Sequence, residues 1–243
     1  MVEKIYDSNS EIIKLENVFK SYKMGNSFVE ALRNINISIK KGEFIAIVGP
    51  SGSGKSTMMN LVGALDTATK GNIFLDSVDI EKLPESLLAQ IRGRKIGFVF
   101  QTFNLIPSLN AIDNVMLPMV FQGIPKKTRI ERAKKLLERV GLKNRMYFFP
   151  NEMSGGERQK VAIARALVNN PEVILADEPT GNLDSKSGEE ILNIFLELNK
   201  EGKTIIVITH NNEIAKKAKR VIRMRDGYIL EDIKNSNRKI GSM

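Results

Sequence analysis

Residues 44–64 have the sequence FIAIVGPSGSGKSTMMNLVGA, which joins a short apolar run to a glycine-rich loop and a helical pattern. Phe44–Val48 is apolar throughout, which predicts a buried strand, and Ser56–Ala64 has the apolar spacing of a helix. The loop between them, Gly49–Ser56, matches the pattern G-x-x-x-x-G-K-[ST] in full. Glycines let the backbone wrap closely around a polyphosphate, whose charge the loop N–H groups and the helix N-terminus bind. We therefore predict a phosphate-binding loop between a strand and a helix.

The plainer alternative is a glycine-rich turn that only connects the two elements, and the Lys-Ser pair at the helix start argues against it. In a phosphate-binding loop, Lys55 would reach the β- and γ-phosphates and the Ser56 hydroxyl would bind Mg²⁺. The nucleotide-binding residues predicted in this segment are Gly49, Ser51, Gly52, Ser53, Gly54, Lys55, Ser56 and Thr57.

Three further apolar runs resemble the first, namely Ile96–Phe100, Val173–Ala176 and Thr204–Thr209. They are apolar on both faces, as buried parallel strands are, and helical patterns at Glu157–Asn169 and Ser187–Lys200 lie between them. Strands that alternate with helices predict an α/β fold in which helices cover both faces of a mostly parallel sheet.

Polar residues follow each of these runs: Gln101 after the second, Asp177 and Glu178 after the third, and His210 after the fourth. Singly, a glutamine, an acidic loop or a lone histidine is more often structural than functional. In open α/β sheets, however, ligands bind at the carboxyl ends of the strands, so these side chains should meet the phosphate-binding loop. There Asp177 would help to hold Mg²⁺, and Glu178 would polarise a water molecule toward the γ-phosphate.

The remaining sequence divides into a few parts. Before Phe44, alternating apolar residues (Ile13, Leu15, Ile35, Ile37, Ile39) predict a smaller antiparallel sheet. We expect one domain over residues 1–243, with a core of 11–100 and 153–230, a helical subdomain at 101–152 and a polar, frayed tail at 231–243.

The 243 residues include 37 Lys and Arg against 28 Asp and Glu, so the formal net charge is +9. The chain has no cysteine and one histidine, which excludes disulfides, thiolate metal sites, a cysteine nucleophile and multi-histidine metal sites. No apolar run approaches the about 18 residues of a membrane-spanning helix, and Met1–Ser10 lacks the apolar stretch of a secretory signal. We expect a soluble intracellular protein whose basic charge suits nucleic acid, an anionic membrane surface or a phosphorylated ligand.

Ser154-Gly155-Gly156-Glu157-Arg158-Gln159 opens a helix far from the phosphate-binding loop in sequence. Ser154 with Glu157 three residues later is a capping box, which is a structural feature. Two glycines behind a serine also leave a bare helix N-terminus that is open to an anion, and both interpretations can hold together.

These motifs together resemble the ATP-binding subunit of an ABC transporter over nearly all of Leu15–Leu230. The resemblance implies a P-loop NTPase core with an N-terminal antiparallel β subdomain and an inserted α-helical subdomain. It assigns Gly49–Ser56 to Walker A, Val173–Asp177 to Walker B, Glu178 to the catalytic glutamate, Gln101 to the Q-loop, Ser154–Gln159 to the signature, Asn182–Asp184 to the D-loop, His210 to the switch histidine and Tyr22 to the aromatic residue that stacks on adenine.

The resemblance also implies a mechanism, with ATP and Mg²⁺ as cofactors. Two chains would pair head to tail, so that Ser154, Gly155, Gly156 and Glu157 of one close on the ATP held by the other. Lys55, Gln101, Glu178 and His210 would then act in hydrolysis, and Ser56, Gln101 and Asp177 would hold the metal. The partner that the motor moves would be an integral membrane permease, with the chain peripheral on the inner face of the cell membrane.

Two stretches, Phe100–Pro107 and Gly181–Ser185, are similar to the branch that holds lipoprotein-release, macrolide-efflux and cell-division ATPases. Met153 and Glu157 depart from the usual Leu and Gln of the signature, and neither change removes the Ser-Gly-Gly site. The apolar stretch Phe103–Val120 is explained mostly by packing, and we expect part of it to line a groove for a permease helix.

Other classes of protein share some of these features. A DNA-associated ABC ATPase would suit the positive charge, but the chain has no long heptad insertion and no cysteine-based zinc module, so no nucleic acid partner is expected. A GTPase or small-molecule kinase would not explain Ser154–Glu157, and no [NT]-K-x-D motif is present. The presence of Glu178 argues against a regulatory ATPase that does not hydrolyse ATP.

Overall fold

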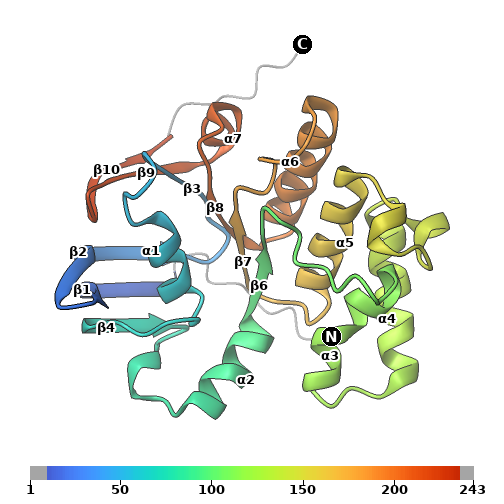
Figure 1. Cartoon of the computed structure of the whole chain (residues 1–243), viewed down its shortest axis with the longest axis horizontal. Helices are drawn as coiled ribbons and strands as arrows, with labels where there is room; N and C mark the ends of the chain where they lie inside the picture. Colours follow the sequence, from blue (N-terminus) through green and yellow to red (C-terminus); the bar gives the residue numbers. More distant parts are fainter. Residues whose placement is uncertain (1–9, 236–243) are drawn as a thin grey trace.

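The computed structural model describes residues 10–235, and its centre is a six-stranded sheet in the order β10-β9-β3-β8-β7-β6 (Figure 1). All neighbouring strands are parallel except β10, which runs antiparallel to β9. The strands of this sheet are β3 (Phe44–Val48), β6 (Ile96–Val99), β7 (Val173–Asp177), β8 (Thr204–Ile208), β9 (Arg220–Arg225) and β10 (Tyr228–Lys234). The prediction of a mostly parallel sheet is confirmed.

Helices cover both faces of this sheet, which is why its central strands are apolar throughout. In β3, Ile45 and Ile47 pack in the same core as α1 (Lys55–Val62), whereas Phe44 and Ala46 pack with α5 (Gly155–Leu167) and α6 (Ser185–Lys200). Successive residues of a strand point to opposite faces, so both sets are buried. Two short helices complete these layers, α2 (Glu85–Lys95) and α7 (Asn212–Lys217).

A second, antiparallel sheet has the strand order β2-β1-β4-β5 and lies on the opposite side of the molecule from helices α3 (Ala111–Phe121) and α4 (Lys126–Arg139) (Figure 1). Its strands are β1 (Glu11–Met24), β2 (Ser27–Lys40), β4 (Lys70–Leu75) and β5 (Val78–Asp79), and a 3₁₀ turn, η1 (Ile80–Lys82), follows them. Ile13 pairs with Ile39 and Leu15 with Ile37, and all four are buried. The predicted N-terminal antiparallel sheet is confirmed.

Residues 101–152 contain two helices, α3 (Ala111–Phe121) and α4 (Lys126–Arg139), and two 3₁₀ turns, η2 (Lys143–Arg145) and η3 (Pro150–Glu152). Their apolar side chains form a separate core that also includes Val161, Ala164 and Val168 from α5 and the residue after it. Ile163 and Leu167 of the same helix pack in the core of the sheet. Helix α5 therefore joins the helical part to the sheet through side chains on two of its faces.

The predicted frayed tail from Glu231 onward is wrong for residues 231–234, because they belong to β10. Asp232 accepts hydrogen bonds from Arg220 Nε at 2.7 Å and Nη2 at 2.6 Å, and Arg220 also donates to Glu43 at 2.9 Å. Arg220 is buried, so this pairing fixes the charged second half of the strand. The rest of the predicted tail, residues 236–243, lies outside the described residues, as do residues 1–9.

Candidate functional site

A cavity of about 690 Å³ opens at the carboxyl ends of β3, β6, β7 and β8. This volume is in the range of small-molecule sites. Twelve of the predicted site residues line it: Gly49, Ser51, Gly52, Ser53, Gly54, Lys55, Ser56, Thr57, Gln101, Asp177, Glu178 and His210. The adjacent order of the four strands brings these distant sequence positions together at one edge.

The backbone of the loop requires glycine at two positions. Gly49 has φ 155°, and a Cβ atom there would lie 2.2 Å from the carbonyl oxygen of Met224 on β9. Gly54 has φ 96°, and a Cβ atom there would lie 2.5 Å from the carbonyl oxygen of Ala31 on β2. The loop is thus packed against both sheets and has no room for side chains at these points.

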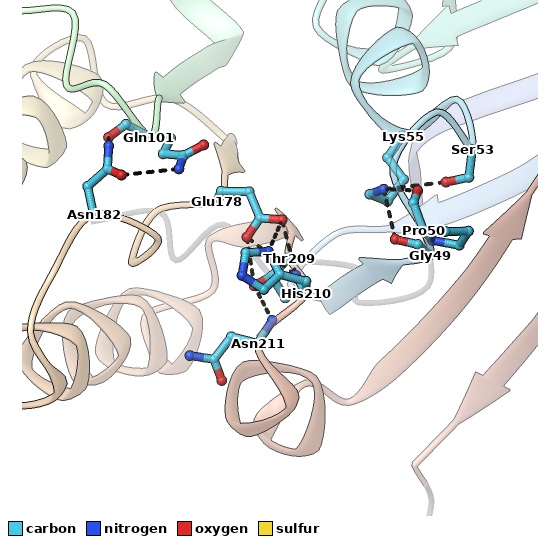
Figure 2. A network of polar contacts seen from close by, with 10 residues as sticks. All are labelled: Gly49, Pro50, Ser53, Lys55, Gln101, Glu178, Asn182, Thr209, His210 and Asn211. Atoms are coloured by element: carbon cyan, nitrogen blue, oxygen red, sulfur yellow. Dashed lines mark hydrogen bonds and ion pairs between the residues drawn. The ribbon is translucent and has the colours of Figure 1, made fainter.

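Helix α1 starts directly after Gly54 and has no side-chain cap on its first N–H groups. Lys55 is the first residue of this helix, and its ammonium group donates to the carbonyl oxygens of Gly49 at 2.9 Å and Pro50 at 2.7 Å (Figure 2). Uncapped N–H groups and a nearby ammonium group together form a site for an anion such as the phosphates of a nucleotide.

Asp177 ends β7 and is partly buried in the same cavity. Burial raises the pKa of Asp177 above its ordinary value, the neighbouring charge of Glu178 adds to this, and Lys55 acts in the opposite direction. Burial and the charge of Glu178 thus disfavour the ionised form of Asp177, and a cation bound beside the carboxylate would offset this effect. The cavity offers oxygen donors from Asp177, the Ser56 hydroxyl and the Gln101 amide, which fits Mg²⁺ held jointly with phosphates and water. No group of three or more acidic, His or Cys residues that could hold a metal alone occurs within residues 10–235.

Glu178 lies at the start of the loop after β7 with φ 43°, an unusual conformation for a residue with a side chain. Its carboxylate accepts hydrogen bonds from the His210 backbone N–H at 3.1 Å and from the Thr209 hydroxyl at 3.3 Å, and it contacts the His210 ring nitrogen Nδ1 at 2.8 Å (Figure 2). The end of β8 thus orients the carboxylate that follows β7. The His210 side chain itself is 75% exposed, so it is free to contact a ligand.

Gln101 follows β6 and pairs with Asn182 in the loop after β7 (Figure 2). The Gln101 side-chain amide donates to Asn182 Oδ1 at 3.3 Å, and the Asn182 side-chain amide donates to the backbone carbonyl oxygen of Gln101 at 3.1 Å. This reciprocal pair links two loops that border the cavity.

Tyr22 is not among the residues that line the cavity, but it lies next to one that does. It pairs across the strands with Val29, and directly paired residues of antiparallel strands point to the same face. Val29, Glu30 and Ala31 of β2 line the cavity, and the sequence reasoning missed them. The only feature that could have indicated them is that they lie in the same hairpin as Tyr22.

Ser154, Gly155, Gly156 and Glu157 lie outside this cavity, at the N-terminus of α5. The capping box is present, because the Ser154 hydroxyl accepts from the Glu157 N–H at 3.2 Å and Glu157 accepts from the Ser154 N–H at 2.9 Å. A Cβ atom on Gly156 would lie 2.8 Å from the Ser187 hydroxyl at the start of α6. The structure therefore does not bring this helix N-terminus to the phosphate-binding loop of the same chain.

Gln159 was predicted only as the last residue of the signature, with no role of its own, and its side chain is completely buried. Its amide donates to the carbonyl oxygen of Pro179 at 2.7 Å and more weakly to that of Phe100 at 3.5 Å. Phe100 precedes Gln101 and Pro179 follows Glu178, so one side chain of α5 connects both loops to the helix of Ser154. A polar residue on the apolar face of a predicted helix was the available signal.

Several known proteins are similar to this chain over most of its length. The sequence model of the ABC transporter family matches residues 32–181. YvrO, an uncharacterized ABC transporter ATP-binding protein of Bacillus subtilis (strain 168), is 55% identical over 221 residues, which are 91% of this chain and 96% of YvrO. The macrolide export ATP-binding/permease protein MacB of Campylobacter fetus subsp. fetus is 49% identical over 93% of this chain, which spans only 35% of MacB.

A solved structure is similar over the same range. The ATP-binding cassette MJ0796 of Methanocaldococcus jannaschii, described as a dimer in a post-hydrolysis state bound to ADP and Pi, superposes with a TM-score of 0.85 at 47% identity, covering 91% of this chain and 98% of that one. Fold, family match and relatives lead to one conclusion: the chain belongs to the ABC transporter family as an ATP-binding subunit, and it is an ATPase.

Proposed function

We propose that two copies of this chain form a head-to-tail dimer that encloses ATP between the phosphate-binding loop of one copy and Ser154–Glu157 of the other. The observation that carries the proposal is the position of the α5 N-terminus, an anion-binding feature outside the cavity of its own chain. The dimeric arrangement recorded for MJ0796 supports it. Since the γ-phosphate contacts both copies only when they are closed, ATP would favour the closed dimer and hydrolysis would release it.

Within each site, the proposed roles follow from the contacts. Lys55 and the first N–H groups of α1 bind the β- and γ-phosphates, and Glu178, oriented by Thr209 and His210, accepts a hydrogen bond from the attacking water. Mg²⁺, held by Ser56 and Asp177 with Gln101 nearby, would neutralise phosphate charge when bound. Tyr22 presents its ring to the adenine base at the rim of the cavity.

Glu178→Gln tests this proposal, because the amide keeps the shape of the carboxylate but is a far weaker base. We expect ATP binding to persist, turnover to fall by a factor of about 100 or more, and an ATP-dependent dimer to accumulate in size-exclusion chromatography. Adding Ser154→Arg to this variant supplies the control, since it blocks the α5 N-terminus and leaves the phosphate-binding loop intact. A dimer that survives the second substitution, or a Glu178→Gln chain that stays monomeric in saturating ATP, would contradict the shared site.

We also propose that the motor acts on a membrane permease in the branch that includes MacB. No helix within residues 10–235 is both long and apolar enough to span a bilayer. A cavity of about 590 Å³ between α2, α3, α5 and β6 supplies a docking groove that contains Phe98, Phe121 and two arginines, Arg92 and Arg165. No acidic residue is among the described residues that line it. This groove suits a cytoplasmic permease helix with apolar side chains and an acidic residue, which would hold the chain at the inner membrane face.

Of Phe103–Val120, part of which is expected from the sequence to line a permease groove, only Asn104 and Pro118 line this cavity. Leu105 packs against the core of the helical part, so a charge there would disturb folding. Phe121 is 79% exposed, so a charge at this position tests the groove better than a charge at Leu105. Phe121→Asp should lose co-purification with the permease encoded by a neighbouring reading frame and keep ATP binding. Tyr147→Asp, at a residue 67% exposed outside the groove, should lose neither. Unchanged co-purification of Phe121→Asp would place the contact elsewhere.

A further inference from the structure

A buried lysine lies beside Tyr22 and belongs to none of the motifs discussed above. Lys20 is only 9% exposed, although it lies on a strand at the edge of the nucleotide cavity. Its ammonium group donates to Asp66 Oδ1 at 2.6 Å and to the carbonyl oxygen of Thr67 at 2.8 Å, and it lies 4.9 Å from the centroid of the Tyr22 ring. A buried ammonium group is costly unless it is paired, so these contacts hold Lys20 in one place.

Asp66 holds the other end of the tyrosine. The Tyr22 hydroxyl donates to Asp66 Oδ2 at 2.8 Å, and the Thr67 N–H donates to Asp66 Oδ1 at 2.8 Å. Burial acts to raise the pKa of Asp66, but the hydrogen bonds from Lys20, Tyr22 and Thr67 outweigh it and keep this pKa below its ordinary value. The carboxylate is therefore ionised at neutral pH, and its hydrogen bond to the phenol is charge-assisted. Tyr22 is thus restrained both at its ring, by Lys20, and at its hydroxyl, by Asp66.

The loop that carries Asp66 is also bound to β1 through the backbone. The Ser21 N–H donates to the Thr69 hydroxyl at 3.0 Å, and the Thr69 N–H donates to the Phe19 carbonyl oxygen at 2.8 Å. This loop follows α1, the helix that starts at the phosphate-binding loop. The segment that provides the phosphate site at its beginning therefore fixes the position of Tyr22 at its end. Since Val29 points to the same face and lines the cavity, the restrained ring lies at the rim of that cavity.

We propose that Lys20 and Asp66 are positioning residues that hold the Tyr22 ring as a rigid platform for the purine base of the nucleotide. This inference rests on the proposed function, in which Tyr22 contacts the base. Because its hydroxyl is committed to Asp66, Tyr22 offers a stacking face and no hydrogen bond to the base edge. A ring that is fixed before the base arrives loses little side-chain entropy on binding. Without the pair, the ring turns freely and the base binds more weakly.

The test measures the Kd of the full chain for AMP-PNP, a non-hydrolysable ATP analogue, and for inorganic tripolyphosphate, which has no base. Tyr22→Phe keeps the ring without the hydroxyl, and Asp66→Asn and Lys20→Met remove the two partners. We expect each variant to weaken AMP-PNP binding by about threefold to tenfold and to leave tripolyphosphate binding within about twofold. Tyr22→Ala should cost about tenfold or more. In the Tyr22→Ala background, Asp66→Asn should have no further effect on AMP-PNP binding, because it acts through the ring.

Lys82→Met is the matched control, since the exposed Lys82 forms an ion pair with Asp79 at 2.6 Å after the same antiparallel sheet, and its loss should change neither Kd. Equal weakening of both ligands in Asp66→Asn would mean that the network only supports the loop, which overturns the inference. The inference is also overturned if Tyr22→Ala weakens AMP-PNP binding while Tyr22→Phe and Asp66→Asn leave it unchanged. In that case Tyr22 would still contact the base, but the network would not position it. Unchanged AMP-PNP binding in Tyr22→Ala would show that Tyr22 does not contact the base. That result would overturn this inference and the proposed role of Tyr22.

Discussion

Individual residues of the site act through contacts that the sequence pattern does not specify. Glu178 illustrates this, since three groups directly after β8 contact a carboxylate that belongs to the loop after β7. Two of these groups, the Thr209 hydroxyl and the His210 backbone N–H, donate hydrogen bonds and remain when the imidazole is removed. The contribution of the His210 imidazole can therefore be measured separately from that of the two groups that still orient Glu178.

His210→Ala should reduce ATP turnover by a factor of about 100, because the ring that contacts Glu178 and lines the nucleotide cavity is lost. Since the side chain is 75% exposed, the free energy of unfolding should change by less than about 0.5 kcal/mol. ATPase rates, ATP affinity and chemical denaturation, measured on the same preparation, check this. Near-normal turnover would show that the ring has no part in hydrolysis.

At the scale of elements, α5 connects the parts of the molecule that the site depends on. Its N-terminus carries Ser154, its faces join two hydrophobic cores, and Gln159 reaches the loops after β6 and β7. A rotation of this helix would therefore move the backbone directly beside Gln101 and Glu178. This coupling exists because the buried amide of Gln159 donates to a carbonyl oxygen in each loop.

Gln159→Leu should lower the free energy of unfolding by about 1–3 kcal/mol, because the Pro179 carbonyl oxygen would lose its buried donor. ATP turnover should fall as well, since the loop of Glu178 loses its support. Urea denaturation measures the first effect and steady-state kinetics the second. Lys160→Met is the neighbouring control: it removes an ion pair with the exposed Glu190, and a loss comparable to that of Gln159→Leu would contradict this account.

At the scale of the whole molecule, a network of four charges joins distant segments. Lys41 contacts Asp76 at 3.0 Å and Glu172 at 3.2 Å, and Lys95 contacts Asp76 at 2.7 Å and also Glu172. These residues come from the turn before β3, the turn after β4, the end of α2 and the segment before β7. Hydrogen bonds from Lys95 and Lys41 lower the pKa of Asp76, and burial opposes them. For Glu172, burial acts to raise the pKa, but the same lysines outweigh it and lower that pKa.

This network predicts a pH dependence of stability. A carboxylate whose pKa is lower in the folded state stabilises the fold fully above about pH 5 and loses this effect as the pH falls below about 4. Glu172→Gln should therefore cost about 0.5–1 kcal/mol at pH 7, an amount limited by partial solvent exposure, and less at pH 3. Thermal or urea unfolding at both pH values checks this. Glu201→Gln, in an exposed pair with Arg139, should cost less at pH 7; a pH-independent cost for Glu172→Gln would contradict the network.

Four strands of the main sheet, the phosphate-binding loop and the four polar groups at the sheet edge could be predicted from the amino-acid sequence alone. These features come from local physics: apolar runs form buried strands, a glycine-rich loop before a helix binds phosphate, and parallel strands bring the residues after their carboxyl ends to one edge. Gln101, Asp177, Glu178 and His210 could be placed together without knowing any side-chain contact.

The features that depend on contacts between distant segments could not be predicted from the sequence. Residues 231–234 form a strand because Arg220 pairs with Asp232, although their own sequence is polar. Similarly, Lys20 is buried because Asp66 lies 46 positions away in sequence and next to it in space. Such pairings carry no local periodicity, since their free energy comes from charges and hydrogen bonds that meet only after the chain has folded.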